Sequence, residues 1–243
     1  ILLFAHLDHP YQANDNLSGV ACLVDLATRI KSEYTIKIIF CPETIGSIAY
    51  AKMADISKVD FVMAFECIGS NENLVIQKSF NEYNRINFIA HLAAQDCNAQ
   101  FQKAPFRKLL GSDEYFFNDP NVGIPGILFA RYPYKGYHSS DDTPEKLNYE
   151  KIEEVGNVML KTIEYYEKDF IPKRNYKGVL FRSKYGAHTP SKLANLDIDY
   201  LLWGMDGKKY LSQILMDERG QLMLSFNWCV DLLNQLRKDN LIL

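Results

Sequence analysis

Apolar stretches alternate with helical stretches through the first two thirds of this chain of 243 residues. Apolar runs at residues 1–7, 35–41 and 59–67 have the length of buried strands, and the segments at 17–30 and 48–54 are predicted helices. Because strands that alternate with helices usually form parallel sheets, the pattern predicts an α/β fold. Its sheet should be mostly parallel or mixed and sandwiched by helices.

The same alternation continues along the chain. We expect strands at residues 74–80 and 126–130, a helix at 85–97 and a long amphipathic helix at 149–170, which would close a first domain over residues 1–170. The residues expected to face the core from the helix at 17–30 are Val20, Leu23, Val24 and Ala27.

A polar segment with proline and glycine, residues 171–178, is typical of a linker and leads to a second region, residues 179–243. This region opens on a strand-like VLFRS segment at 179–183. Its helical candidates lie at 197–205, 210–216 and 226–238, with breaks at Gly207 and Gly220. Its aromatic side chains expected in a core are Trp203, Tyr210 and Trp228. Short helices after one strand predict a small winged-helix-like α+β domain.

Charge and composition argue against several classes of partner. The net charge is −3, and residues 179–243 carry eight basic side chains against seven acidic ones, whereas nucleic-acid-binding domains are usually clearly basic. We therefore expect no nucleic-acid partner, and a homo-oligomer formed through the second domain instead. No apolar run approaches the roughly 20 residues of a membrane span. Five cysteines without a CxxC pair are typical of reduced thiols in a cytoplasmic protein.

Metal-ligand residue types follow the first strand. His6 and Asp8 come directly after the apolar run, and a buried strand delivers such residues to the carboxyl edge of its sheet. Imidazole and carboxylate are the usual non-thiolate ligands of zinc. Their spacing does not place both on one ion from a regular strand, so we expect His6 to bind the metal and Asp8 to orient it. A polar loop is the alternative interpretation.

Three further acids extend this pattern. Asp15 precedes the helix at 17–30, where it is either a helix cap or a metal ligand. Glu43 follows the second strand and is either an exposed loop residue or a general base for metal-activated water. Glu66 ends the third strand, where a buried acid is costly unless it binds a metal or pairs with lysine or arginine.

Two later loops carry the remaining candidates. His138 follows the strand at 126–130, and either Asp141 or Asp142 could orient it. A solvent-exposed loop histidine is the alternative. Asp113 could cap the segment that follows it or contact the amino group of a substrate.

Seven short motifs, in order, resemble the zinc-dependent exopeptidase family that includes bacterial leucyl aminopeptidases and glutaminyl cyclases. They are HLDHP, NDNLSGVA, PETIGS, ECIG, GSDE, GIPG and YHSSDDTPE. The resemblance covers residues 1–170 and is nearest to bacterial aminopeptidase-like proteins with a C-terminal winged helix, which residues 179–243 resemble more weakly. It implies a zinc hydrolase that removes an N-terminal residue from a peptide or cleaves a small amide.

The resemblance also implies a role for each matching residue. One or two zinc ions would be held by His6, Asp15, Glu66 and His138, with Asp15 bridging them; Asp8 would orient His6, Glu43 would be the general base, and Tyr137 would help to polarise the scissile carbonyl.

This chain departs from the family pattern at several positions. Thr44 stands where the family has a second, metal-binding glutamate, and Glu66 stands where it has aspartate. His9 is an alternative to His6 as the ligand. The chain begins at Ile1 without a methionine and lacks the family's upstream strands, so we expect further sequence before it. Alternative functions are a degenerate metal-binding scaffold or interaction protein and a deacylase of a small-molecule or sugar amide.

Overall fold

The computed structural model describes residues 1–187, 192–216 and 222–243. It divides into two compact units, Ile1–Glu164 and Tyr165–Leu243, and the division falls inside the long helix α4, Tyr149–Lys168. Gly220, expected to be a helix break, lies outside the described residues. None of the helices in the described part of the chain is both long enough and apolar enough to cross a membrane.

The first unit is built on a six-stranded sheet in the order β2-β1-β3-β6-β4-β5. The strands are β1 (Leu2–His6), β2 (Lys37–Cys41), β3 (Val62–Glu66), β4 (Leu74–Gln77), β5 (Phe101–Ala104) and β6 (Gly126–Ala130). The first four strands of that order are mutually parallel, whereas β4 is antiparallel to β6 and parallel to β5. The predicted mostly parallel, mixed sheet is confirmed.

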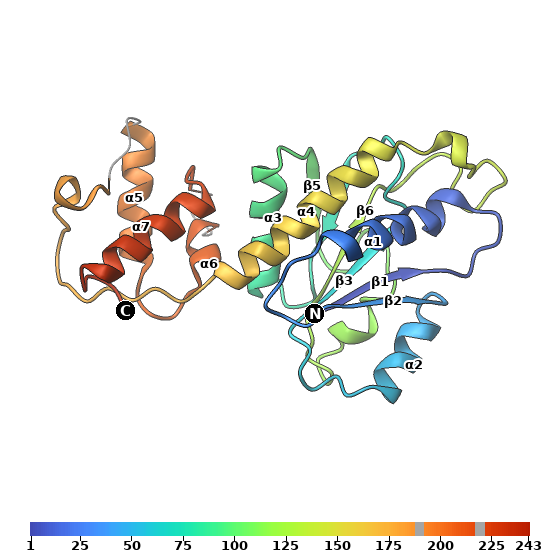
Figure 1. Ribbon diagram of the computed structural model, residues 1–243, viewed down its shortest axis with the longest axis horizontal. Helices are drawn as coiled ribbons and strands as arrows, with labels where there is room; N and C mark the ends of the chain where they lie inside the picture. The colour runs from blue at the N-terminus through green and yellow to red at the C-terminus, as the bar shows by residue number, and fades with distance from the viewer. Residues whose placement is uncertain (188–191, 217–221) are drawn as a thin grey trace. The chain divides into compact units, whose positions relative to one another are not determined.

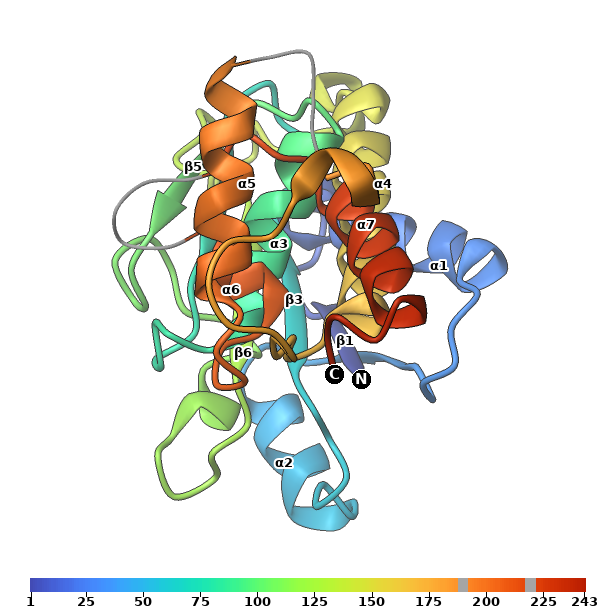
Figure 2. The ribbon, with the colours of Figure 1, turned by 90° about the vertical axis from the view of Figure 1, so that its left-hand side faces the viewer.

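Helices cover both faces of this sheet. They are α1 (Ser18–Arg29), α2 (Ile45–Met53), α3 (Arg85–Asp96) and α4. Figures 1 and 2 show α1 and α4 on one side of the sheet and α2 on the other. Leu2 and Phe4 of β1 are buried in one cluster with Ala51 of α2 and Phe117. Because β1, β3 and β6 are covered on both faces, all their residues are buried, as their uninterrupted apolar sequences predict.

Two details of this unit differ from the sequence expectation. Helix α1 buries Cys22 and Leu26, whereas Val24 and Ala27 are exposed. The face of α1 that is covered contains Cys22, Leu23 and Leu26, and the Cys22 thiol donates a weak hydrogen bond to the carbonyl of Ile152 in α4 at 3.8 Å. Strand β5 is absent from the sequence expectation, since its four residues FQKA carry little apolar signal at the edge of the sheet.

The second unit contains α5 (Lys192–Gly204), α6 (Leu211–Leu215) and α7 (Phe226–Lys238). Residues 179–183 form no strand, and a short 3₁₀ turn begins within them at Arg182. Trp203, expected in the core, is 66% exposed, while Phe226 is buried against Tyr165. The predicted linker also forms isolated bridges, from Lys173 to Asp206, which follows α5, and from Arg174 to Ile242 near the C-terminus. The winged-helix assignment stays a prediction.

Candidate metal centre

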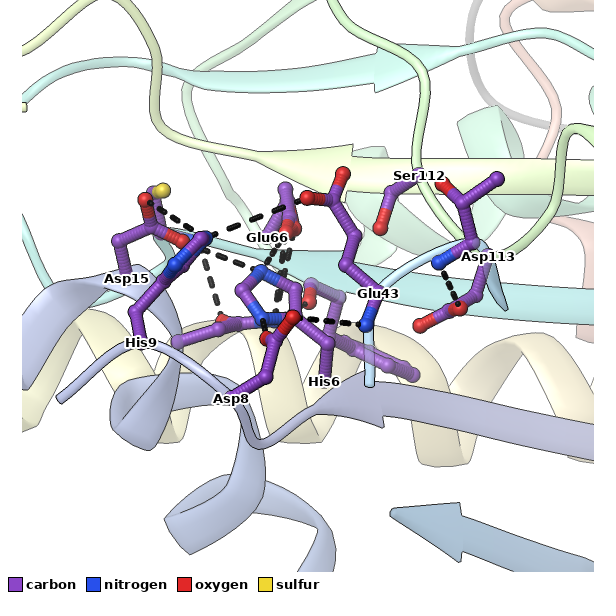
Figure 3. A network of polar contacts seen from close by, with 12 residues as sticks. His6, Asp8, His9, Asp15, Glu43, Glu66, Ser112 and Asp113 are labelled. Carbon is purple, nitrogen blue, oxygen red and sulfur yellow. Dashed lines mark hydrogen bonds and ion pairs between the residues drawn. The ribbon is translucent and has the colours of Figure 1, made fainter. Parts of the chain in front are cut away.

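Four neighbouring parallel strands bring the candidate residues to one edge of the sheet. His6 ends β1, Glu66 ends β3, Glu43 lies two residues after β2, and His138 lies in the loop after β6. Figure 3 shows the side chains from the first three strands, with Asp15, converging in one place. The carboxyl ends of parallel strands meet at one edge, so residues far apart in sequence become neighbours.

His6 is the centre of this cluster. Its Nδ1 lies 2.7 Å from Asp8 Oδ1, and its Nε2 lies 3.1 Å from Asp15 Oδ1 and 2.6 Å from Glu66 Oε1. Burial alone would lower the pKa of His6, but the carboxylates of Asp15 and Glu66 outweigh it and raise that pKa well above its usual range. The Asp8 contact fixes the orientation of the ring, so that Nε2 faces the two buried acids.

Glu66 shares this buried environment. Burial raises its pKa well above the usual value for glutamate, and the contact with His6 only partly offsets this. Within the described residues, the ionic partner of its carboxylate is His6 rather than a lysine or arginine. Two buried carboxylates on one imidazole are costly unless a cation compensates their charge. The surroundings of Glu66 therefore favour a bound cation over a structural ion pair.

The second oxygen of Asp15 faces two more histidines. Asp15 Oδ2 lies 3.1 Å from His138 Nε2 and 3.9 Å from His9 Nε2. Asp15 Oδ2 and His9 Nε2 are buried and make no hydrogen bond, so the short contact with His138 does not have hydrogen-bond orientation. Helix α1 has no side-chain cap, which leaves the capping interpretation of Asp15 without support. Asp15 instead presents one oxygen to each of two neighbouring sites.

Two sets of side chains can each surround an ion and share Asp15. The first ligand group is His6, Asp15 and Glu66, and the second ligand group is His9, Asp15 and His138. Within each group the ligand atoms lie within 4.8 Å of one another. Ligand atoms on one tetrahedral zinc lie about 3.3 Å apart, since zinc bonds to nitrogen and oxygen are about 2.0–2.1 Å long. The donor types, spacings and unpartnered atoms therefore fit zinc.

A third set, His6, Asp8 and His9, also has suitable spacing. The nearer Asp8 oxygen already contacts His6 Nδ1, and the other accepts the backbone N–H of Glu43 at 3.1 Å. Both Asp8 oxygens therefore have partners. Asp8 contacts the His6 ring and connects it to the loop that carries Glu43, and its orienting role stays a prediction.

The NDNLSG segment holds the loop after Glu66 in place. Three alternate side chains accept the backbone N–H groups of three successive residues in that loop. The pairs are Asn16 with Cys67 at 3.2 Å, Ser18 with Ile68 at 3.1 Å and Asn14 with Gly69 at 2.7 Å. Gly19 is required beside them, because a Cβ there would lie 2.7 Å from Asn16 Oδ1. The spacing between Asp15 and Glu66 is thus fixed by hydrogen bonds.

Asp142 positions Asp15 and does not orient His138. Its carboxylate accepts the backbone N–H of Asn14 at 2.7 Å and that of Asp15 at 3.0 Å, and it also accepts the hydroxyl of Tyr134 at 2.8 Å. The sequence suggests His138 as the partner of Asp142 because the two residues are close in the chain. The observed partners, Asn14 and Asp15, are 128 and 127 residues away. Asp141 is exposed and pairs with Lys146 at 3.6 Å.

Replacing Asp142 by asparagine should weaken both the fold and the metal centre. Both oxygens of Asp142 accept hydrogen bonds, so the N–H₂ group of asparagine would face another donor. An unsatisfied buried group costs about 1–3 kcal/mol. Loss of support for Asp15 should lower metal affinity about 10–100-fold. Denaturant unfolding with chelator present and a metal-competition titration measure the two effects. Asp141→Asn is the matched control and should change stability by less than about 0.5 kcal/mol. Equal behaviour of the two variants would contradict the positioning role.

Glu43 lies beside the second ligand group without belonging to it. Its Oε2 is 4.0 Å from His9 Nε2, and its side chain is 32% exposed. Figure 3 shows Ser112 and Asp113 next to it. The Asp113 carboxylate accepts the backbone N–H of Thr44 at 3.0 Å, and burial raises the pKa of Asp113 to about 6. Asp113 thus contacts the loop after β2 rather than capping the residues that follow it.

Tyr137 and His138 stack on each other. Their ring centroids are 3.9 Å apart and their planes differ by 17°. Burial, with Asp15 close by, raises the pKa of the Tyr137 hydroxyl, so it stays protonated at neutral pH and can donate a hydrogen bond. The contact of Tyr137 with a substrate carbonyl stays a prediction.

Comparison with known proteins places the chain beside aminopeptidase-like folds. A Clostridium acetobutylicum protein, named for polysaccharide biosynthesis and for an aminopeptidase-like domain, is 28% identical over 177 residues, which are 67% of this chain and 39% of that protein. A solved structure from Clostridium acetobutylicum, named as a peptidase, matches with a TM-score of 0.81 and 24% identity, over 100% of this chain and 56% of the other. The match therefore covers less than half of the first protein and little more than half of the second.

The first unit has the fold of zinc aminopeptidases. The structure of the Bacillus subtilis zinc aminopeptidase matches with a TM-score of 0.57 and 18% identity, over 68% of this chain and 45% of that enzyme. Glutaminyl cyclases have similar folds. Residues 1–169 match the sequence family described as "Domain of unknown function (DUF4910)". That match includes every residue of both ligand groups, and this chain belongs to the DUF4910 family.

Proposed function

We propose that this protein is a zinc-dependent, aminopeptidase-like hydrolase that cleaves an N-terminal residue or a similar amide. The observation that carries the proposal is the position of Asp15, whose two oxygens face two different sets of ligands. A carboxylate shared by two ligand groups is the arrangement expected of a two-metal hydrolytic centre. The fold shared with zinc aminopeptidases supports this proposal.

Each residue of the cluster has a chemical task in this proposal. His6, Asp15 and Glu66 would hold one ion, and His138 with Asp15 would hold a second. When bound, the metal would supply Lewis-acid activation of water and of the scissile carbonyl. Glu43, whose carboxylate lies 4.0 Å from His9 Nε2, would accept a proton from the water and return it to the leaving amine.

Two groups beside these would assist the substrate. Tyr137, whose ring stacks on that of His138, would donate a hydrogen bond from its hydroxyl to the carbonyl oxygen. Asp113 is a candidate to hold the protonated amino group of a substrate. Its Oδ2 is buried and makes no hydrogen bond, while its Oδ1 holds the loop that carries Glu43.

A second candidate function is hydrolysis of an amide on a sugar. The observation that favours it is the name of the Clostridium acetobutylicum relative, which refers to polysaccharide biosynthesis. The same ligand groups and the same base would serve, since peptide and N-acyl amides react alike. Only the groups that bind the remainder of the substrate would differ.

Metal analysis and a substrate panel test the proposal together. We expect the purified protein, saturated with zinc, to contain two zinc ions and to hydrolyse amides. Chelation should abolish turnover, and zinc should restore it. Aminoacyl amides should be cleaved and their N-blocked analogues spared, whereas cleavage of N-acyl sugars alone would favour the second candidate. A protein that takes up zinc but cleaves no member of the panel would be a metal-binding scaffold instead.

A further inference from the structure

His9 is a half-buried histidine that the proposed function leaves without a task. Its side chain is only 28% exposed, and its Nε2 is buried without a hydrogen-bond partner. Such a nitrogen is costly to bury unless it binds something. The sequence suggests His9 as an alternative to His6, yet His6 has its own contacts to Asp8, Asp15 and Glu66. The two histidines therefore face different oxygens of Asp15.

The surroundings of His9 define what it could bind. Its Nε2 is 3.9 Å from Asp15 Oδ2, which is also buried and makes no hydrogen bond. The rings of His9 and His138 meet edge to face with centroids 5.3 Å apart, and the Nε2 of His138 is 3.1 Å from the same oxygen. Three ligand atoms thus face one point, and two of them, Asp15 Oδ2 and His9 Nε2, make no hydrogen bond.

Position 44 does not offer a comparable ligand. Thr44 has no carboxylate, and its backbone N–H is donated to Asp113 at 3.0 Å. Its φ of 58° is unusual for a β-branched residue and places it in the turn that starts helix α2. A second ion near His138 must therefore obtain its third protein ligand elsewhere.

We propose that His9 is that third ligand, so that His9, Asp15 and His138 together bind the second metal ion. The inference rests on the proposed function. In this arrangement the ligand that Thr44 does not supply is provided by His9, which lies three residues after His6, the last residue of β1. The centre then has three imidazoles and two carboxylates, namely His6, His9 and His138 with Asp15 and Glu66.

The exchange of a carboxylate for an imidazole changes the chemistry of the second ion. Its own ligands would be two neutral imidazoles and a shared carboxylate, whereas the first ligand group has one imidazole and two carboxylates. Imidazole suits zinc, nickel and copper, and carboxylate suits magnesium and manganese. The second ligand group should therefore bind zinc but take up manganese poorly, whereas the first should accept both.

The test compares metal content in four forms of the whole chain: wild type, His9→Ala, His9→Gln and Thr44→Ala. After loading with excess zinc and removal of free metal, wild type and Thr44→Ala should hold two ions, and both His9 variants should hold one. Zinc affinity of the second site should fall at least about 100-fold, since loss of a direct ligand exceeds the 10–100-fold typical of outer contacts. X-ray absorption should count three imidazoles per two zinc ions in wild type.

The outcomes separate this inference from the proposed function. Two ions in wild type and two in both His9 variants would overturn the role of His9 and leave a two-metal hydrolase standing. Two ions in wild type and one in Thr44→Ala would also overturn it, because position 44 would then supply the ligand. Fewer than two ions in zinc-saturated wild type would overturn the two-metal centre and the role of His9 together. Circular dichroism of each variant establishes that it is folded.

Discussion

Replacement of Asp15 by asparagine should remove both metal ions from this protein. Asp15 is the member common to both ligand groups, with one oxygen 3.1 Å from His6 Nε2 and the other 3.1 Å from His138 Nε2. Asparagine keeps the shape of the side chain but removes its negative charge and one acceptor. Each site would then lose its shared carboxylate, so we expect zinc affinity to fall more than about 100-fold at both.

Elemental analysis of Asp15→Asn after zinc loading is the measurement. Asp141→Asn is the control, because Asp141 is exposed in the same loop as His138 and should leave both ions in place. Unfolding measured with chelator shows whether the fold survives. Retention of two ions by Asp15→Asn would contradict the shared ligand.

Replacement of Glu43 by glutamine should abolish turnover without removing metal. Glu43 is not a member of either ligand group, yet its carboxylate is 4.0 Å from His9. A glutamine side chain cannot accept the proton of the water nucleophile, and loss of a general base typically costs about 10²–10⁴-fold in rate. The substrate KM should change much less than kcat, because the base acts in the transition state.

Kinetics on whichever amides the wild type cleaves, together with metal analysis, test this prediction. Glu72→Gln is a suitable control, because Glu72 is exposed and belongs to neither ligand group. Full activity of Glu43→Gln on every substrate of the wild type would remove Glu43 from the mechanism. Loss of metal together with activity would instead make Glu43 a ligand.

The sheet and the strand-end residues could be predicted because both depend on local patterns. Buried strands have continuous apolar sequences, and residues that follow parallel strands meet at one edge, so the sequence alone predicts that His6 and Glu66 lie near each other. Strand β5 could not be predicted, because its short sequence at the sheet edge has no such pattern. The exposure of Trp203 could not be predicted either, because hydrophobic periodicity does not reveal which face of a helix is covered by other residues.

The roles of Asp142 and His9 depend on long-range contacts. Asp142 accepts backbone groups more than 120 residues away, and nothing in its own segment indicates this. The sequence makes His9 a candidate, but only the structure distinguishes the oxygen of Asp15 that it faces from the one that His6 faces. Sequence can suggest which residue types gather at a site. The division of those residues between two ions is a property of their geometry.

The hydrogen bonds made by the NDNLSG segment have a consequence for ion size. Asn14, Asn16 and Ser18 are neutral side chains that fasten the backbone after Glu66 to the segment that carries Asp15. The separation between Asp15 and Glu66 is therefore set during folding rather than by the ion that binds. Calcium takes six to eight oxygen ligands at about 2.3–2.6 Å and needs a site that can widen. Hydrogen bonds between these side chains and the backbone oppose such widening, so we expect the centre to discriminate between cations by their radius.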